Sequence, residues 1–143
     1  MVYELLLYIH VFSSILAIGP FFACFLIINK LQSADERQES ACIGLFSSVI
    51  RMVKHAGHVL VLSGFFLMWK GGWSWKEPWI ALTLIVMFSS ILFLARAFTP
   101  VLKEFNDRHR EKNILIKKLQ RTLWVYIGLL MIMLWFMITK PSF

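Results

Sequence analysis

Long apolar runs separated by short polar stretches dominate this chain. Four runs contain no Asp, Glu, Lys or Arg, and they cover residues 5–28, 55–69, 78–95 and 122–139. Each run, prolonged by a turn at its weaker end, approaches the roughly 20 residues that a helix needs to cross a hydrocarbon core of about 30 Å. The pattern predicts an all-α protein, an integral membrane four-helix bundle with a single domain. The expected helices span about residues 2–29, 43–69, 78–99 and 110–139.

The composition supports the same class. Hydrophobic residues make up 59% of the 143 residues, and the mean hydropathy is +0.70. Soluble domains contain roughly 45–50% apolar residues, so this chain is richer in them than a soluble domain. We therefore expect a multi-pass protein of a bacterial plasma membrane, with the lipid bilayer as its first partner.

Basic residues are concentrated in two connections. Twelve of the fifteen Lys and Arg residues fall in 29–54 and 96–121. The positive-inside rule therefore predicts both termini outside and both connections in the cytoplasm. The second connection alternates apolar and charged residues at helical spacing, which predicts a cytoplasmic helical hairpin between helices 3 and 4, turning near 106–107, with His109 on its surface. Attraction to anionic lipid explains the net charge of +7, so we expect no nucleic acid partner.

The sequence lacks the residue patterns of several common catalytic and metal-binding sites. Cys24 and Cys42 are isolated and form no C-x-x-C pair, which argues against a thiolate metal site. The acidic residues lie in turns or near helix ends, so no paired carboxylates are expected inside the membrane. The sequence shows no phosphate-binding loop and no nucleophilic serine arrangement.

The histidines in the apolar runs are the clearest candidates for a functional site. An imidazole in hydrocarbon costs free energy unless another helix, a cofactor or a metal satisfies it. A rise of 1.5 Å per residue from Val2 places His10 about 12 Å below the outer boundary, and counting from Trp69 places His58 about 17 Å and His55 about 21 Å below it. His10 and His58 are therefore expected near the same level.

Two imidazoles at one depth suit the axial positions of a b-type haem in a helical bundle. We predict a b-haem protein for electron transfer or for haem or porphyrin handling, with His10 and His58 as axial ligands and His55 as the alternative to His58. Nearby cations offer partners for the haem propionates. The candidate cofactor-binding residues are His10, His58, His55, Arg51, Lys54 and Arg96. If the protein is an enzyme, we expect a haem-dependent membrane oxidoreductase with a quinone or porphyrin partner.

Three other interpretations stay open. His10 can instead form a hydrogen bond to Ser13, Ser47 or a backbone carbonyl and so hold the helices in register. Copper handling would combine His10 with soft thioether ligands, for which the candidates are Met68, Met87 and Met131. The chain can also be a non-catalytic subunit of a larger membrane complex or a homo-oligomer, docking through its tryptophan-rich outer turn or its basic hairpin.

The first helix carries a resemblance to known families. His10 is followed nine residues later by Gly19, within IHVFSSILAIG. This H-x8-G pattern resembles the first helix of a small bacterial four-helix membrane family, of copper-resistance protein D-type membrane proteins and of HemJ-type protoporphyrinogen oxidases. The similarity extends through Arg51-x12-Gly64 and 79–100. It implies a haem or metal ligand at His10. HemJ-type proteins have a lysine within the stretch aligned with WIALTL, where this chain has Thr83, so their oxidase activity does not carry over.

Overall fold

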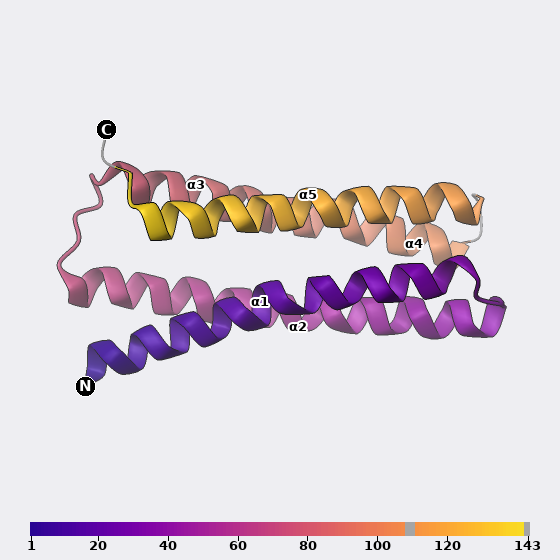
Figure 1. Ribbon diagram of the computed structural model, residues 1–143, viewed down its shortest axis with the longest axis horizontal. Coiled ribbons are helices and arrows are strands. Elements are labelled where there is room, and N and C mark those ends of the chain that lie inside the picture. Colours follow the sequence, from indigo (N-terminus) through magenta and orange to yellow (C-terminus); the bar gives the residue numbers. More distant parts are fainter. Residues whose placement is uncertain (108–110, 142–143) are drawn as a thin grey trace.

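The computed structural model describes residues 1–107 and 111–141, apart from the side chain of Asn106, and it is helical throughout (Figure 1). His109 lies outside the described residues, so its predicted surface position stays a prediction. No described residue belongs to a β-strand. The elements are α1 (Val2–Gln32), α2 (Glu36–Gly71), α3 (Pro78–Phe93), the π-helix η1 (Leu94–Phe98), α4 (Thr99–Asp107) and α5 (Lys112–Thr139).

Four helices are long and apolar enough to cross a membrane, as the sequence predicted. The third is built from α3, η1 and α4, because the chain continues as one rod through Pro78–Phe105. Its π-helical turn lies directly before Pro100, which has no N–H to donate to the carbonyl of Arg96. The wider turn accommodates this missing hydrogen bond, as π-bulges commonly do at irregular points of a helix.

Helix α2 begins earlier than the apolar pattern indicated. It starts at Glu36 rather than near residue 43, because Asp35 caps its N-terminus. The Asp35 carboxylate accepts a hydrogen bond from the backbone N–H of Gln38 at 2.9 Å. Capping of this kind satisfies a backbone donor that has no partner within the helix. The polar residues after Asp35 therefore extend α2 beyond its apolar run.

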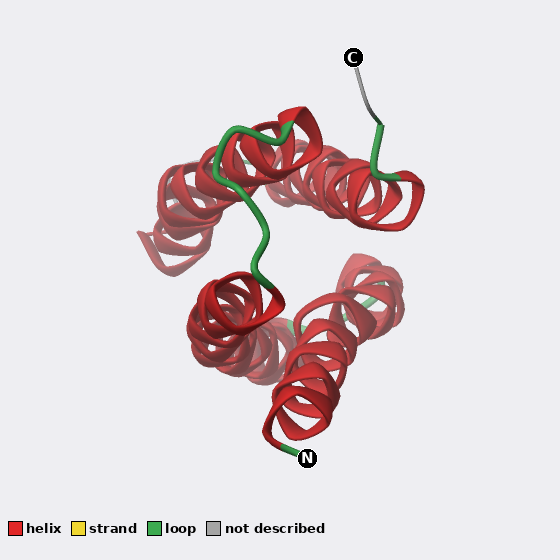
Figure 2. Cartoon of the chain, turned by 90° about the vertical axis from the view of Figure 1, so that its left-hand side faces the viewer, coloured by secondary structure: helices red, strands yellow, loops and turns green. Residues whose placement is uncertain are grey.

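The helices are arranged as two pairs. Helices α1 and α2 pack along each other, α3 packs against α5, and α1 also contacts α5. Figure 2 shows the four rods around a common axis. No Cα atom of α2 comes within 8 Å of one in α3 among the described residues, although the two helices are consecutive in the chain. Contact between the two pairs is therefore made mainly by α1 with α5, and α2 adds contacts with α4.

An aromatic cluster joins the two pairs. Phe21 of α1 lies 4.6 Å from Tyr126 of α5 and 6.1 Å from Phe98 of η1 between ring centroids. Phe98 also lies 5.9 Å from Phe46 of α2 and 6.0 Å from Tyr126. All four side chains are buried. Aromatic pairs at these separations add to the stabilisation that burial alone gives.

The two ends of the bundle differ in character. The N-terminus, the end of α5 and the 72–77 turn lie together at one end, here named the terminal end (Figure 1). At the other end, the Lys112 ammonium donates a hydrogen bond to the Ala34 carbonyl at 2.7 Å and lies 3.4 Å from the Glu39 carboxylate. This contact fastens α5 to the loop between α1 and α2. The assignment of this basic end to the cytoplasm stays a prediction.

Candidate functional site

His10 lies on the inward-facing stripe of α1. Ser13, Ala17 and Phe21 follow it at intervals of three or four residues, and all three are buried. Residues at this spacing share one face of a helix. The half-buried imidazole of His10 therefore faces the interior of the bundle and meets α2.

The contacts of His10 with α2 favour one of the two neutral tautomers of its ring. Nδ1 lies 3.1 Å from the carbonyl oxygen of Leu60 and 3.1 Å from Oγ of Ser63. A carbonyl oxygen only accepts hydrogen bonds, so Nδ1 is the donor. The Ser63 hydroxyl donates its own hydrogen to the same Leu60 carbonyl at 2.9 Å, which leaves its oxygen free to accept from His10. Nε2 is then the lone-pair nitrogen, and no hydrogen bond to it is found in the described part of the chain.

Because Gly64 has no side chain, the imidazole of His10 packs directly against the backbone of α2. A Cβ atom at this position would lie 3.1 Å from Cε1 of His10 and 3.5 Å from Nδ1. Gly57, two turns earlier on the same helix, has no atom within 4 Å of the corresponding point. A methyl group at position 64 would therefore push the His10 ring away from α2, whereas one at position 57 would meet no neighbouring atom.

His58 does not face His10. At about 100° per residue, His58 lies about 200° around α2 from Leu60, the residue that His10 contacts. Both His58 and His55 are exposed on the opposite side of α2, with ring centroids 6.5 Å apart. The structure thus does not bring together the predicted axial pair of His10 and His58. His10 and His58 therefore lie on different faces of the helix pair.

A family model for predicted integral membrane proteins, DUF2269, matches residues 4–141 of the chain. The chain belongs to the DUF2269 family. Together with its four membrane-length helices, this match makes the DUF2269 protein a multi-pass membrane protein. Comparisons with curated proteins and with solved structures find no match. The resemblance of the first helix to copper-resistance protein D-type and HemJ-type proteins therefore gains no support from these comparisons.

The cations predicted to hold propionates are also separate from His10 in the DUF2269 protein. Arg51 and Lys54 are exposed, and Arg51 lies nine residues before Leu60, which places it about 180° around α2. Together with His55 and His58, they form what we name the α2 outer face. Arg96 is exposed as well, in η1 of the other helix pair. Lys54, His55 and His58 therefore share a face of α2 with Arg51, whereas His10 contacts the other side of this helix.

Soft metal ligands do not converge on His10 either. Met131 is exposed on α5, Met87 is partly buried on α3, and Met68 lies toward the terminal end of α2. Among the described residues, no group of three or more His, Cys, Asp or Glu side chains is placed to hold a metal ion. Cys24 and Cys42 are both buried free thiols.

The residues that orient His10 are only partly recognisable in the sequence of the DUF2269 protein. A hydrogen bond to a carbonyl across the bundle was among the sequence-based alternatives, but the serine involved is Ser63, not Ser13 or Ser47. Ser13 donates to the carbonyl of Ile9 in its own helix at 2.7 Å. One feature of the sequence could have identified this contact, namely the Ser63–Gly64 pair. It places a hydroxyl group next to a residue without a side chain, near the level expected for His10.

Proposed function

We propose that this protein binds a b-type haem inside the bilayer, with Nε2 of His10 as an axial ligand. The observation that carries the proposal is the donor role of Nδ1 toward Leu60. Histidines that ligate metals commonly donate their other ring N–H to a carbonyl or carboxylate, which fixes the tautomer and the ring orientation. His10 has this arrangement, with its lone-pair nitrogen left for a ligand.

The surroundings of His10 are suited to a flat, apolar cofactor. The stripe of α1 beyond His10 begins with the small side chains Ser13 and Ala17, and the backbone at Gly64 of α2 holds the His10 ring itself in place. Bound there, haem would supply a one-electron iron couple within the membrane, which supports electron transfer or haem handling.

The proposal departs from the sequence-based ligand set. In this proposal the α1/α2 pair supplies one ligand to the iron, His10, because the His58 side chain lies on the other side of α2. Arg51 and Lys54 are then too far around the helix to meet the propionates of a haem on His10. Their long side chains can instead reach the phosphates of the nearer membrane surface, as basic residues near helix ends do.

A hemin titration tests the proposal. Purified protein in lipid nanodiscs should bind hemin in a saturable one-to-one manner and show a Soret band shifted from that of hemin in empty nanodiscs. A titration that matches empty nanodiscs would contradict haem binding. Metal analysis of protein from cells supplied with both metals should find iron, and stoichiometric copper without iron would favour the copper interpretation instead.

A further inference from the structure

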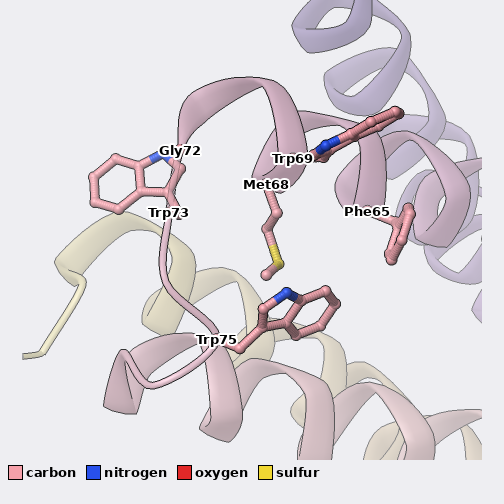
Figure 3. A pocket seen from close by; sticks show the side chains of 6 residues that line it. All are labelled: Phe65, Met68, Trp69, Gly72, Trp73 and Trp75. Carbon is pink, nitrogen blue, oxygen red and sulfur yellow. The ribbon is translucent and has the colours of Figure 1, made fainter.

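A second site lies at the terminal end of α2, away from the hydrogen bonds of His10. A cavity of about 470 Å³ that is open on one side is formed there by α2 and the turn that follows it. Its lining residues are Phe65, Met68, Trp69, Gly72, Trp73 and Trp75 (Figure 3). We infer that this cavity binds the ring of an isoprenoid quinone. The inference goes beyond haem binding and does not depend on it.

One wall of the cavity is the indole of Trp73, which is held from several directions. A Cβ atom at Gly71 would lie only 2.7 Å from the indole ring, so Trp73 packs directly over glycine backbone. The ring of Trp79 meets it edge to face at 5.5 Å between centroids. The ammonium of Lys140 lies 4.5 Å from the ring centroid, within the range of a cation–π interaction. These contacts fix the orientation of the Trp73 wall.

Phe65 and Trp75 line another part of the cavity. Their ring centroids are 5.8 Å apart, and Met68 extends from α2 toward the indole of Trp75 (Figure 3). A thioether beside an aromatic ring is a favourable and adaptable contact. The cavity is thus bounded by flat aromatic faces and a polarisable side chain, and its volume falls in the range of small-molecule sites, about 300–1,000 Å³.

The lining selects among ligands by hydrogen bonding and charge. None of the six lining residues is charged, and the ammonium of Lys140 lies against the Trp73 ring. Indole N–H groups only donate, and those of Trp69, Trp73 and Trp75 form no hydrogen bond to a described protein group. A ligand with carbonyl acceptors on a flat apolar ring satisfies them. Lys140 beside Trp73 disfavours a quaternary ammonium group, and the hydroxyl oxygen of a quinol is a weaker acceptor than the carbonyl oxygen of a quinone.

The position of the cavity suits a ligand that is dissolved in the membrane. Tryptophans concentrate at membrane interfaces, and four of the six tryptophans of the chain lie in residues 69–79 at the terminal end. Phe65 and Met68 belong to the membrane-length part of α2, whereas Trp73 and Trp75 belong to the turn. A ring at this level can keep its isoprenoid tail among the lipid chains.

Calorimetric titration with a short-tailed ubiquinone tests the inference. The wild-type protein in nanodiscs should bind it saturably, after subtraction of empty nanodiscs. Trp75→Ala should weaken binding by about tenfold, which is the effect of losing one aromatic contact of about 1.4 kcal/mol. Gly71→Ala should also weaken it, because the added methyl group displaces Trp73. The reduced quinol form should bind more weakly than the quinone.

Trp135→Ala is the matched control, because Trp135 is as exposed as Trp75 (64% against 58%) and does not line the cavity. The affinity of Trp135→Ala for the short-tailed ubiquinone should equal that of the wild type. Equal loss or equal retention in the two tryptophan variants would overturn the inference. If Trp75→Ala fails to fold, photolabelling of the wild type with an azidoquinone decides: labels within residues 65–75 support the site, and labels elsewhere overturn it. Haem binding is measured separately, so its failure would leave this result standing.

Discussion

Replacing Phe21 with alanine is expected to lower the free energy of unfolding by about 3–5 kcal/mol, the usual cost of deleting a buried phenylalanine ring. Phe21 is completely buried and touches Tyr126 and Phe98, so it joins α1 to both α5 and η1. Helices α1 and α5 make most of the contact between the two helix pairs, and Phe21 lies within that contact. Removal of this ring should therefore loosen the pairs from each other.

Phe22 provides the control for Phe21. It is the next residue in the same helix, has the same side chain, and is 53% exposed on the outer side of the bundle. Phe22→Ala should cost less than about 1 kcal/mol, since exposed positions contribute little to folding. Unfolding of both variants in mixed micelles gives the comparison. Equal losses at residues 21 and 22 would show that the aromatic cluster does not hold the helix pairs together.

Replacing His10 with alanine is expected to weaken hemin binding by more than about a hundredfold. Loss of a residue that merely supports a metal ligand costs 10–100-fold, so loss of the ligand itself should cost more. His58→Ala and His55→Ala should bind hemin like the wild type, because both side chains lie on the α2 outer face. Hemin titrations of the three variants, followed by the Soret band, measure these effects.

Loss of His10 also removes its hydrogen bonds to Leu60 and Ser63, so misfolding has to be separated from loss of a ligand. Added imidazole should restore a ligand to iron in folded His10→Ala protein and bring back the Soret band. If His58→Ala lost as much hemin binding as His10→Ala, the result would favour the axial pair of His10 and His58 that the sequence suggested. Undiminished binding in His10→Ala would remove His10 from the site.

The fold was largely predictable because membrane crossing imposes a simple pattern. A helix in lipid needs about 20 apolar residues, and the four uninterrupted runs met this condition. The start of α2 was missed because residues 36–42 are mostly polar and resemble a loop when only hydropathy is considered. The cap formed by Asp35 and Gln38 is a local signal that does not depend on hydropathy, and it marks the actual boundary.

The sequence-based prediction of the candidate site rested on depth and left out the rotation of each helix. The rise per residue placed His10 and His58 near one level, but it says nothing about the direction in which each side chain points. In a soluble helix, the polar face would reveal that direction. Arg51 and Lys54 share a face of α2 with His58, so the sequence did carry a sign that His58 points away from the side on which Leu60 and Ser63 meet α1.

The orientation of the Trp73 wall was likewise hidden in the sequence. The tryptophan-rich turn was recognised as an interfacial segment, but its cavity depends on Trp73 packing over Gly71 and on Lys140 arriving from the far end of α5. The second of these contacts joins residues more than sixty positions apart. Spacing along the chain carries no information on such a contact.

The most direct test of the central claim is a ¹⁵N NMR spectrum of apo protein labelled at its histidine ring nitrogens, with the His10 signals assigned by their loss in His10→Ala. Nitrogens with and without a bound hydrogen give well-separated signals. We predict that Nδ1 of His10 carries the hydrogen and that Nε2 is the unprotonated nitrogen. A spectrum with the hydrogen on Nε2 and a bare Nδ1 would contradict the account, because the nitrogen proposed to bind iron would then have no free lone pair.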